Sequence, residues 1–463
     1  MPQDPVPSLL SRATELLEKQ FTSLPTFEST ADLAAMERIL EDVALRMGDN
    51  YPYFHPLYAG QMLKPPHPVA RAAYALAMTI NPNNHARDGG RASSEMEIEA
   101  VQGIAGIFGW TEFLGHLTSS GTMANLEALW VAGQLAPEKR IVGSEQAHYT
   151  HQRISAVLKL EYTSIAAGHR GRMDLEVLEA ELRKGDVGTV VVTLGTTALG
   201  AVDPLDEVLV LRARYGFRVH VDAAYGGYFR LIFNALDAPA RRAFEAISHA
   251  DSIVIDPHKH GLQPYGCGCV LFRDPSVGRF YKHDSPYTYF TSKQLHLGEI
   301  SLECSRAGAS AVALWATQRL LPLVPGGEFA RGLASSRAAA LEIDRRLRQD
   351  KSGRFQPLAT GAPELDIVVW KLKAASPERA SALAQEIFSA CAVRDLHLAL
   401  VQLPSAWFEP VAESEPQSRT SDSAGLVTCL RSVLMKPEHE AWLDSIWERL
   451  TASCTEVMGG NRS

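Results

Sequence analysis

The stretch SIVIDPHKHGLQPYGCGCVLFRD, residues 252–274, contains two apolar runs separated by a polar turn. Residues 253–255 and 267–272 have the composition of buried strands, and Asp256-Pro257 and Gly261 interrupt the pattern between them. The turn carries Lys259. A lysine at the end of a buried strand loses solvation, which lowers the pKa of its amine and makes it a nucleophile. A lone turn lysine is more often an ordinary solvated side chain, so the rest of the chain must decide.

The bulk properties are those of a globular protein that acts on small molecules. The chain has 463 residues, 46% of them apolar and 21% charged, with a formal net charge of −8. This charge gives no reason to expect nucleic acid or an anionic membrane as a partner. No signal-like or membrane-spanning apolar run is found, so we expect a cytoplasmic location. Cys267 and Cys269 form a CxC pair that favours buried strand cysteines over a metal site, and we predict no metal.

The N-terminal two thirds of the chain alternate between apolar runs and helical patterns. Residues 8–20 and 31–47 are expected to form two amphipathic helices of an arm, and a helix after residue 92 would be capped by Ser93 or Ser94. Strands are expected at 140–143, 188–194, 217–221 and 252–255, with helices at 175–182 and 205–215. This alternation predicts an α/β fold with a mainly parallel sheet covered on both faces. Ligands bind beyond the carboxyl ends of such strands.

The remainder of the chain predicts a smaller α+β region. It contains helical patterns at 328–349 and 377–393 and apolar strands at 364–372 and 427–434. Residues 409–425 are polar and rich in Pro and Ser, which is typical of a mobile surface loop. We therefore expect an N-terminal helical arm (1–60), a large domain (61–322) and a small C-terminal domain (323–463).

Three groups at predicted strand ends have the chemistry needed to hold a phosphorylated aromatic cofactor. Ser120-Gly121-Thr122 opens a helix, where backbone N–H groups and the helix dipole favour a phosphate. Asp222 follows an apolar strand and precedes small residues, so it can pair with a protonated ring nitrogen. His148 can stack on a ring. Each group also has an ordinary interpretation, as a helix cap for the first two and as a structural histidine for the third.

Taken together, these motifs resemble the group II amino-acid decarboxylases that depend on pyridoxal 5'-phosphate (PLP), a family of the PLP-dependent transferase fold type I. The resemblance covers nearly the whole chain and includes TSSGTMANL, EQAHYTHQR, TLGTTALGAVDPL, HVDAAYGG and DPHKHG. It implies a phosphate turn at Ser120, Gly121 and Thr122 and a Schiff-base lysine at Lys259. The other cofactor-binding residues that it implies are His148, Thr196, Asp222, Ala224, Asp256 and His258.

The resemblance also implies residues for substrate binding and proton transfer. HPLYAGQ is similar to a substrate-pocket stretch of the family and would place Gln61 in that pocket, although a loop glutamine is the alternative. CLRSVL is similar to the strand whose arginine receives the substrate carboxylate, which makes Arg431 the candidate, with a surface ion pair as the alternative. A loop tyrosine, Tyr287 in preference to Tyr289, would protonate the substrate carbon, with His258 as a further candidate.

The implied activity is decarboxylation of an L-amino acid to an amine and CO2 by a homodimer with its site at the interface. Asp256-Pro257 before His258 is closer to archaeal tyrosine decarboxylases than to glutamate or aromatic ones. Gln61 and Arg431 favour an acidic or small polar substrate, whereas the aromatic residues of 51–58 permit a tyrosine-like one. The alternatives are a carbon-carbon lyase similar to sphingosine-phosphate lyase, an oxygen-using aldehyde synthase and a catalytically idle binding protein. A second lysine expected in the lyases is missing from GLQPYGCG.

Overall fold

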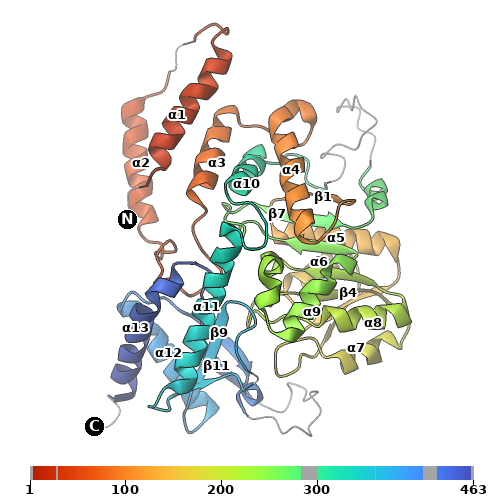
Figure 1. Cartoon of the computed structure of the whole chain (residues 1–463), viewed down its shortest axis with the longest axis vertical. Coiled ribbons are helices and arrows are strands. Elements are labelled where there is room, and N and C mark those ends of the chain that lie inside the picture. Colours follow the sequence, from red (N-terminus) through yellow and green to blue (C-terminus); the bar gives the residue numbers. More distant parts are fainter. Residues whose placement is uncertain (1–3, 28–29, 283–300, 360, 410–424, 460–463) are drawn as a thin grey trace.

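The structure is a computed structural model that describes residues 4–27, 30–282, 301–359, 361–409 and 425–459. Within these residues the chain forms a seven-stranded sheet and a four-stranded sheet, each with helices packed on it (Figure 1). The predicted α/β architecture of fold type I is confirmed. The expected domain boundaries, between residues 60 and 61 and between 322 and 323, remain predictions.

The larger sheet is mainly parallel, as predicted. Its strand order is β1-β7-β6-β5-β4-β2-β3, and the neighbours from β6 to β3 are all parallel. Strand β7 runs antiparallel to both β6 and β1. The sequence analysis did not predict β1. The strands are β1 (Leu114–Thr118), β2 (Arg140–Ser144), β3 (Tyr162–Ile165), β4 (Val187–Thr193), β5 (Arg218–Asp222), β6 (Ser252–Ile255) and β7 (Gly268–Phe272).

Both faces of this sheet are buried under helices. Along β4, Val190 and Val192 belong to one apolar cluster and Val191 to another, because successive side chains point to opposite faces of a strand. Near-continuous apolar strands of this kind are typical of parallel sheets covered on both sides. The helices of this region are α4 (Arg91–Ile107), α5 (Gly121–Leu135), α6 (Thr150–Val157), α7 (Leu175–Leu182), α8 (Leu205–Tyr215), α9 (Ala238–Ala246) and α10 (Gly308–Leu320).

The start of α4 corrects one expectation. The helix begins at Arg91 with Gly90 at the N-cap, so Ser93 and Ser94 lie inside its first turn and are buried. The hydroxyl of Ser93 contacts the side chain of Asn84 and the carbonyl of Gly90. A Cβ on Gly90 would lie 2.6 Å from the Asn84 side-chain oxygen. Close packing against the 81–90 loop therefore sets the helix start, and the serine side chains are used in that packing.

The smaller sheet is antiparallel in the order β10-β11-β9-β8. Its own apolar cluster includes Trp370, Leu430 and Ile387 and is separate from the clusters of the larger sheet. The expected mobile loop at 409–425 lies almost wholly outside the described residues. The elements of this region are α11 (Glu328–Gln349), β8 (Phe355–Pro357), β9 (Ile367–Leu372), α12 (Pro377–Val393), β10 (Ala399–Pro404), β11 (Leu426–Val433) and α13 (His439–Gly459).

The N-terminal helices stand apart from both cores. Helices α1 (Val6–Glu18) and α2 (Leu33–Met47) bury none of their residues, and Figure 1 shows them projecting beside α3 (Pro68–Ile80). An ion pair between Arg71 and Asp4, 2.9 Å long, links α3 to the segment before α1. Among the helices that the structure describes, none is long and apolar enough to cross a membrane.

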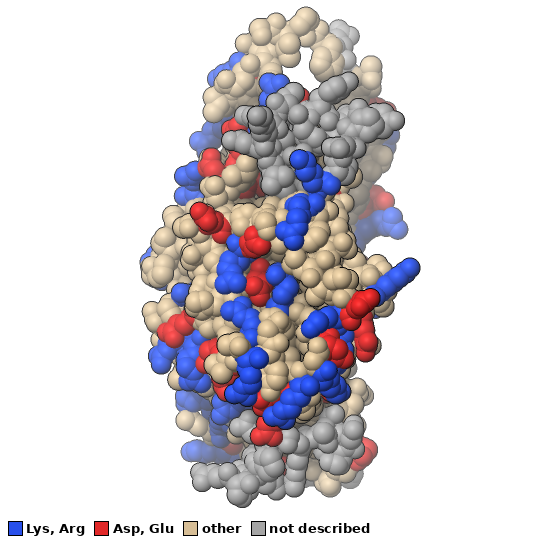
Figure 2. Space-filling view, turned by 90° about the vertical axis from the view of Figure 1, so that its right-hand side faces the viewer, with Lys and Arg blue, Asp and Glu red and all other residues tan. Residues whose placement is uncertain are grey.

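The face that α7 and α8 contribute to carries charges of both signs. Figure 2 shows Lys and Arg side chains along the middle of this face, with Asp and Glu between them. On α7, Glu179 pairs with Arg183 and Arg214, and Glu181 pairs with Lys184. Exposed pairs of this kind contribute little to stability. Because positive and negative side chains alternate, this surface does not carry a large electrostatic field of one sign.

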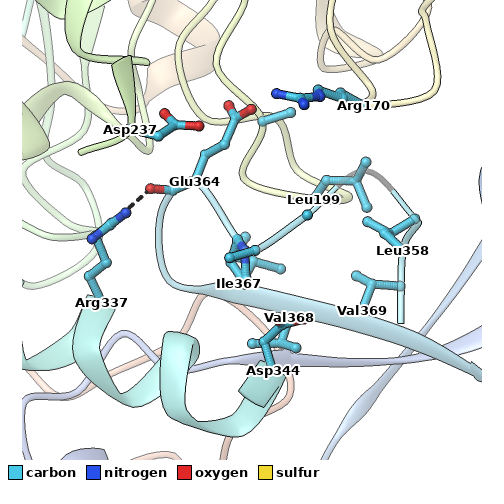
Figure 3. A pocket seen from close by; sticks show the side chains of 14 residues that line it. Arg170, Leu199, Asp237, Arg337, Asp344, Leu358, Glu364, Ile367, Val368 and Val369 are labelled. Carbon is cyan, nitrogen blue, oxygen red and sulfur yellow. Dashed lines mark hydrogen bonds between the residues drawn. The ribbon is translucent and has the colours of Figure 1, made fainter. Parts of the chain in front are cut away.

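Polar contacts join the two sheet regions around a cavity of about 300 Å³ (Figure 3). Arg337, on α11, donates from Nε to the carbonyl of Glu364 at 3.0 Å and from Nη1 to the carbonyl of Ala235 at 3.1 Å. The carboxylate of Glu364 accepts the backbone N–H of Val202 at 2.6 Å and pairs with Arg172. The contacts thus tie the segment before β9 to loops of the larger sheet region.

We predict that Arg337→Ala destabilises the protein by about 1–3 kcal/mol, because two carbonyl groups at this junction lose a charged donor. The matched control is Arg345→Ala on the same helix, whose side chain is exposed and pairs with Glu342. That exposed pair is worth about 1 kcal/mol or less. The measurement is the urea midpoint of unfolding for the three proteins. Equal midpoints for the two variants would contradict the structural role of Arg337.

Candidate active site

A cavity of about 180 Å³ lies where strands of the larger sheet end. Its lining comes from segments that directly follow β1, β2, β4, β5 and β6, because the carboxyl ends of parallel strands meet at one edge of the sheet. Most of the residues that the sequence analysis selected line it: Ser120, Gly121, Thr122, His148, Asp222, Ala224, Asp256, His258 and Lys259. Segments separated by more than 100 residues in the chain therefore form one site.

Lys259 lies on a tight turn and faces an acidic partner. Its Nζ is 3.0 Å from Oδ2 of Asp256, and its backbone N–H donates to the Asp256 carbonyl at 3.0 Å. The side chain is 22% exposed, so Lys259 is not enclosed in an apolar interior. His258 is fixed by a 2.7 Å contact between its Nδ1 and the carbonyl of Cys267, in the segment that returns to β7.

Asp222 is a buried, ionised carboxylate. Its Oδ1 accepts the backbone N–H of Ala224 at 3.1 Å, and its Oδ2 accepts from Nε2 of His151 at 2.8 Å. Burial alone would raise the pKa of Asp222, but the hydrogen bond and charge of His151 and the charge of Lys259 hold it well below its usual range. A group with a basic nitrogen in this cavity would therefore meet a negative charge.

His148 presents a neutral ring to the same cavity. Burial lowers its pKa, the charge of Asp222 opposes this effect, and the charge of Lys259 adds to it. Its Nδ1 accepts the backbone N–H of Thr150 at 3.3 Å, which fixes the ring. A neutral, oriented imidazole suits stacking on an aromatic ring.

The first turn of α5 forms the opposite wall. Ser120 caps the helix by accepting the N–H of Met123 at 3.2 Å, and it also lines the cavity. The turn can therefore be a helix cap and part of the cofactor site at the same time. A Cβ on Gly121 would lie 2.5 Å from Oδ2 of Asp256. Only glycine allows the helix N-terminus to approach the Lys259 turn so closely.

The lining fits PLP, which the resemblance implies. The α5 N-terminus offers backbone N–H groups for a phosphate, Asp222 offers a carboxylate for a ring nitrogen, and Lys259 offers an amine for an aldehyde. In addition, Oδ1 of Asp256 is buried and has no hydrogen-bond partner among the described residues. A buried carboxylate oxygen without a donor indicates a site that awaits one.

Comparison with known proteins decides the family. The pyridoxal-dependent decarboxylase conserved domain matches residues 35–324 of this chain. The chain belongs to this family of PLP-dependent amino-acid decarboxylases. The family's cofactor is PLP, and the alternative of a carbon-carbon lyase similar to sphingosine-phosphate lyase is not favoured.

Relatives and solved structures agree with this assignment. An L-tyrosine decarboxylase of Enterococcus faecium is 28% identical, with 75% of this chain and 74% of that protein covered. A probable L-tyrosine/L-aspartate decarboxylase of Methanothermobacter thermautotrophicus is 29% identical, with 71% and 86% covered. The structure of Oryza sativa TDC with PLP and tryptamine has a TM-score of 0.77 at 19% identity, with 99% of both chains covered, and shows the same fold.

Four predicted residues lie elsewhere or outside the described part of the chain. Thr196 is fully buried and does not line the cavity, because its hydroxyl accepts the N–H of Ala201 at 3.1 Å. Its neighbours Thr193, Gly195 and Thr197 line the cavity instead. Gln61 is exposed and is not in the lining. Tyr287 and Tyr289 lie outside the described residues.

Arg431 lies close to the site without lining the cavity. It is buried, and it donates from Nη2 to the carbonyl of Thr197 at 2.6 Å and from Nε to the carbonyl of Ala198 at 3.1 Å. No described carboxylate pairs with it, so the alternative of a surface ion pair does not apply in the described part of the chain. Burial lowers its pKa, while nearby Tyr225 and Asp366 act to raise it.

His151 is the residue that sequence reasoning missed. It lies three residues after His148 and is fully buried, and its Nδ1 has no hydrogen-bond partner among the described residues. Since a carboxylate only accepts, Nε2 must carry the proton shared with Asp222. The HxxH spacing of His148 and His151, just before and within the first turn of α6, was the available signal.

We predict that His151→Leu weakens the binding of PLP to the apoenzyme about 10- to 100-fold, because Asp222 loses a charge-assisted hydrogen bond. Burial would then raise the pKa of Asp222 with less opposition, and the carboxylate would hold a protonated ring nitrogen less well. His151→Gln keeps an N–H donor and is expected to retain most of the affinity. The measurement is a PLP titration of each apoenzyme. Equal affinity for wild type and His151→Leu would show that His151 does not position Asp222.

Proposed function

We propose that this enzyme decarboxylates an aromatic L-amino acid of the tyrosine type, with Lys259 as the residue that carries the cofactor. The observation that supports the proposal is the meeting of Lys259, Asp222 and His148 in one cavity at three different strand ends. When bound, PLP supplies an aromatic ring that accepts the electron pair left when the carboxylate departs.

The roles of the protein groups follow from their positions. Lys259 would hold PLP through its amine, which can react with the aldehyde of PLP. Asp222, held by His151, would pair with a protonated ring nitrogen, and His148 offers a flat ring on which the cofactor could stack. The N–H groups of the Ser120–Thr122 turn hold the phosphate. His258, next to the lysine and in the lining, assists proton transfer at the substrate carbon together with Tyr287.

Aromatic side chains near His258 support an aromatic substrate. The ring of Tyr265 lies 4.9 Å from that of His258, and the Tyr265 hydroxyl donates to the carbonyl of Met62 at 3.4 Å. In the N-terminal stretch 51–58, the rings of Tyr53 and Tyr58 form an edge-to-face pair with centroids 4.9 Å apart. Tyrosine decarboxylases among the relatives agree with this choice. Arg431 is proposed to receive the substrate carboxylate.

Lys259→Ala is predicted to lose the visible absorption band of the holoenzyme and to lower amine formation more than about 1000-fold, because the attacking amine is removed. Lys184→Ala, an exposed lysine paired with Glu181, is the control and is expected to keep both. The activity measurement is a panel of L-amino acids with CO2 and amine assayed together. Hydrogen peroxide and ammonia with little amine would instead indicate an aldehyde synthase. A wild type that binds PLP but leaves L-tyrosine unchanged and acts on an acidic amino acid would overturn the substrate proposal.

We further propose a homodimer in which α1 and α2 pack against a second copy. Met36, Ile39, Leu40 and Val43 form an exposed apolar stripe on α2, at the spacing of one helix face. The chain exposes 22794 Å² of surface, whereas a compact monomer of its mass exposes about 17,000 Å².

The described cysteines are all free, which fits a reducing cytoplasm.

The double variant Ile39→Glu with Leu40→Glu is predicted to shift the protein from dimer to monomer at micromolar concentration, because two charges would enter the apolar contact. Glu41→Ala on the same helix is the control and is expected to remain dimeric. Sedimentation velocity gives the mass of each species. A wild type that sediments as a monomer at all concentrations would refute the proposal.

A further inference from the structure

A second cavity, of about 470 Å³, is larger than the active-site cavity and is lined by different residues. Its walls come from the segment before α3, the first turns of α11 and the loop before α13. Prolines and large apolar side chains form most of the surface, among them Pro65, Phe329 and Leu333. Its volume is in the range of sites that take small organic ligands.

Two lysines from distant parts of the chain face this cavity. Lys436 is 3% exposed and donates to the carbonyl of Tyr58 at 2.6 Å, and Lys64 donates to the carbonyl of Met435 at 3.2 Å. Each ammonium group has three donors, so further donors remain on both. Neither lysine forms an ion pair with a described carboxylate. The charges of Glu438 and Asp366 favour the charged form of Lys64, and that of Glu438 favours the charged form of Lys436. Since neither carboxylate forms a described ion pair with these lysines, an anionic ligand would lower the cost of burying the two cations.

His260 adds an unused polar atom to the same lining. It is 1% exposed, its Nε2 lies 3.3 Å from Oδ2 of Asp366, and neither ring nitrogen has a hydrogen-bond partner among the described residues. Buried polar atoms are nearly always hydrogen-bonded, so an orphan at a cavity wall indicates a ligand. His260 directly follows Lys259 in sequence but lines this cavity and not the active-site cavity.

We propose that this cavity is a second ligand site that binds a small organic anion, with a carboxylate between Lys64 and Lys436 and an apolar body against the proline-rich wall. The carboxylate accepts hydrogen bonds from both ammonium groups, and His260 supplies a further polar contact. This site is independent of the proposed substrate and of the roles of Lys259 and Arg431.

The proposal includes uptake of protons on binding. Burial lowers the pKa of Lys64 to about 8 and that of Lys436 to about 7, and their mutual repulsion adds to the effect on Lys436. An anion favours the charged amines, so protons are taken up near pH 7.5 and affinity falls as pH rises to 8.5. The titratable and charged groups around the cavity are Lys64 and His67, Glu328 and Arg331 on α11, Lys436, Glu438 and His439, and His260 with Asp366 behind it.

The test is calorimetric titration of the wild-type holoenzyme with benzoate, in two buffers of different ionisation enthalpy and at pH 7.0 and 8.5. We expect saturable binding with proton uptake and weaker affinity at pH 8.5. Benzyl alcohol, which lacks the charge, is expected to bind far more weakly. Inorganic phosphate forms a separate arm: stronger binding of phosphate than of benzoate would overturn the carboxylate assignment.

Variants test whether benzoate binds in this cavity. Lys64→Met and Lys436→Met are each expected to weaken benzoate binding about 10- to 100-fold, whereas Lys184→Met is expected to leave it unchanged. Arg431→Met retains benzoate binding if the anion lies in the second cavity and loses it if the anion lies at the substrate site, which would overturn the proposal. Lys436 also donates to the carbonyl of Tyr58, so Lys436→Met could fail to fold. In that case Lys64→Met and the proton uptake of the wild type decide whether benzoate binds in this cavity. No saturable binding to the wild type would also overturn it.

Discussion

The geometry of the site depends on the close approach of the α5 N-terminus to the turn that carries Lys259. A Cβ at Gly121 would lie 2.5 Å from Asp256, and one at Gly268 would lie 2.4 Å from the backbone of Ser120. These contacts join the phosphate-binding turn, the lysine turn and the start of β7. A larger residue at either glycine would move the cofactor-holding groups relative to one another, so the geometry of the site depends on backbone packing as much as on catalytic side chains.

Within that frame the site is an arrangement of opposite charges in a small volume. Two buried carboxylates, Asp222 and Asp256, face one lysine, and histidines hold the carboxylates in place. His151, the charge of Lys259 and the backbone N–H of Ala224 together offset the effect of burial on the pKa of Asp222, with His151 contributing most. The structure places Lys259 beside the carboxylate of Asp256 with its side chain 22% exposed, whereas the sequence alone suggested a lysine in apolar surroundings.

The small sheet region contributes to function through its contacts with the large one. Arg431, on β11, donates to the carbonyls of Thr197 and Ala198. A cation of the smaller-sheet region therefore lies beside the loop that lines the active site. Lys436 holds Tyr58 in the same way. Residues from the two ends of the chain therefore meet around the turn of Lys259, with the active-site cavity and the second cavity formed from different groups of them.

The sequence by itself predicted the parallel sheet and the bounds of α7, α8, α11 and α12, because apolar periodicity is encoded over short stretches. Its motifs, read with the family resemblance, also named nine residues that line the cavity. It did not determine β1, the start of α4, the partner of Asp222 or the displacement of Thr196 from the lining. His151 and Asp222 are 71 residues apart, and Arg431 and Thr197 are 234 apart. Contacts over such separations follow from how sheets and helices pack in three dimensions, and only the tertiary structure decides which side chains then meet.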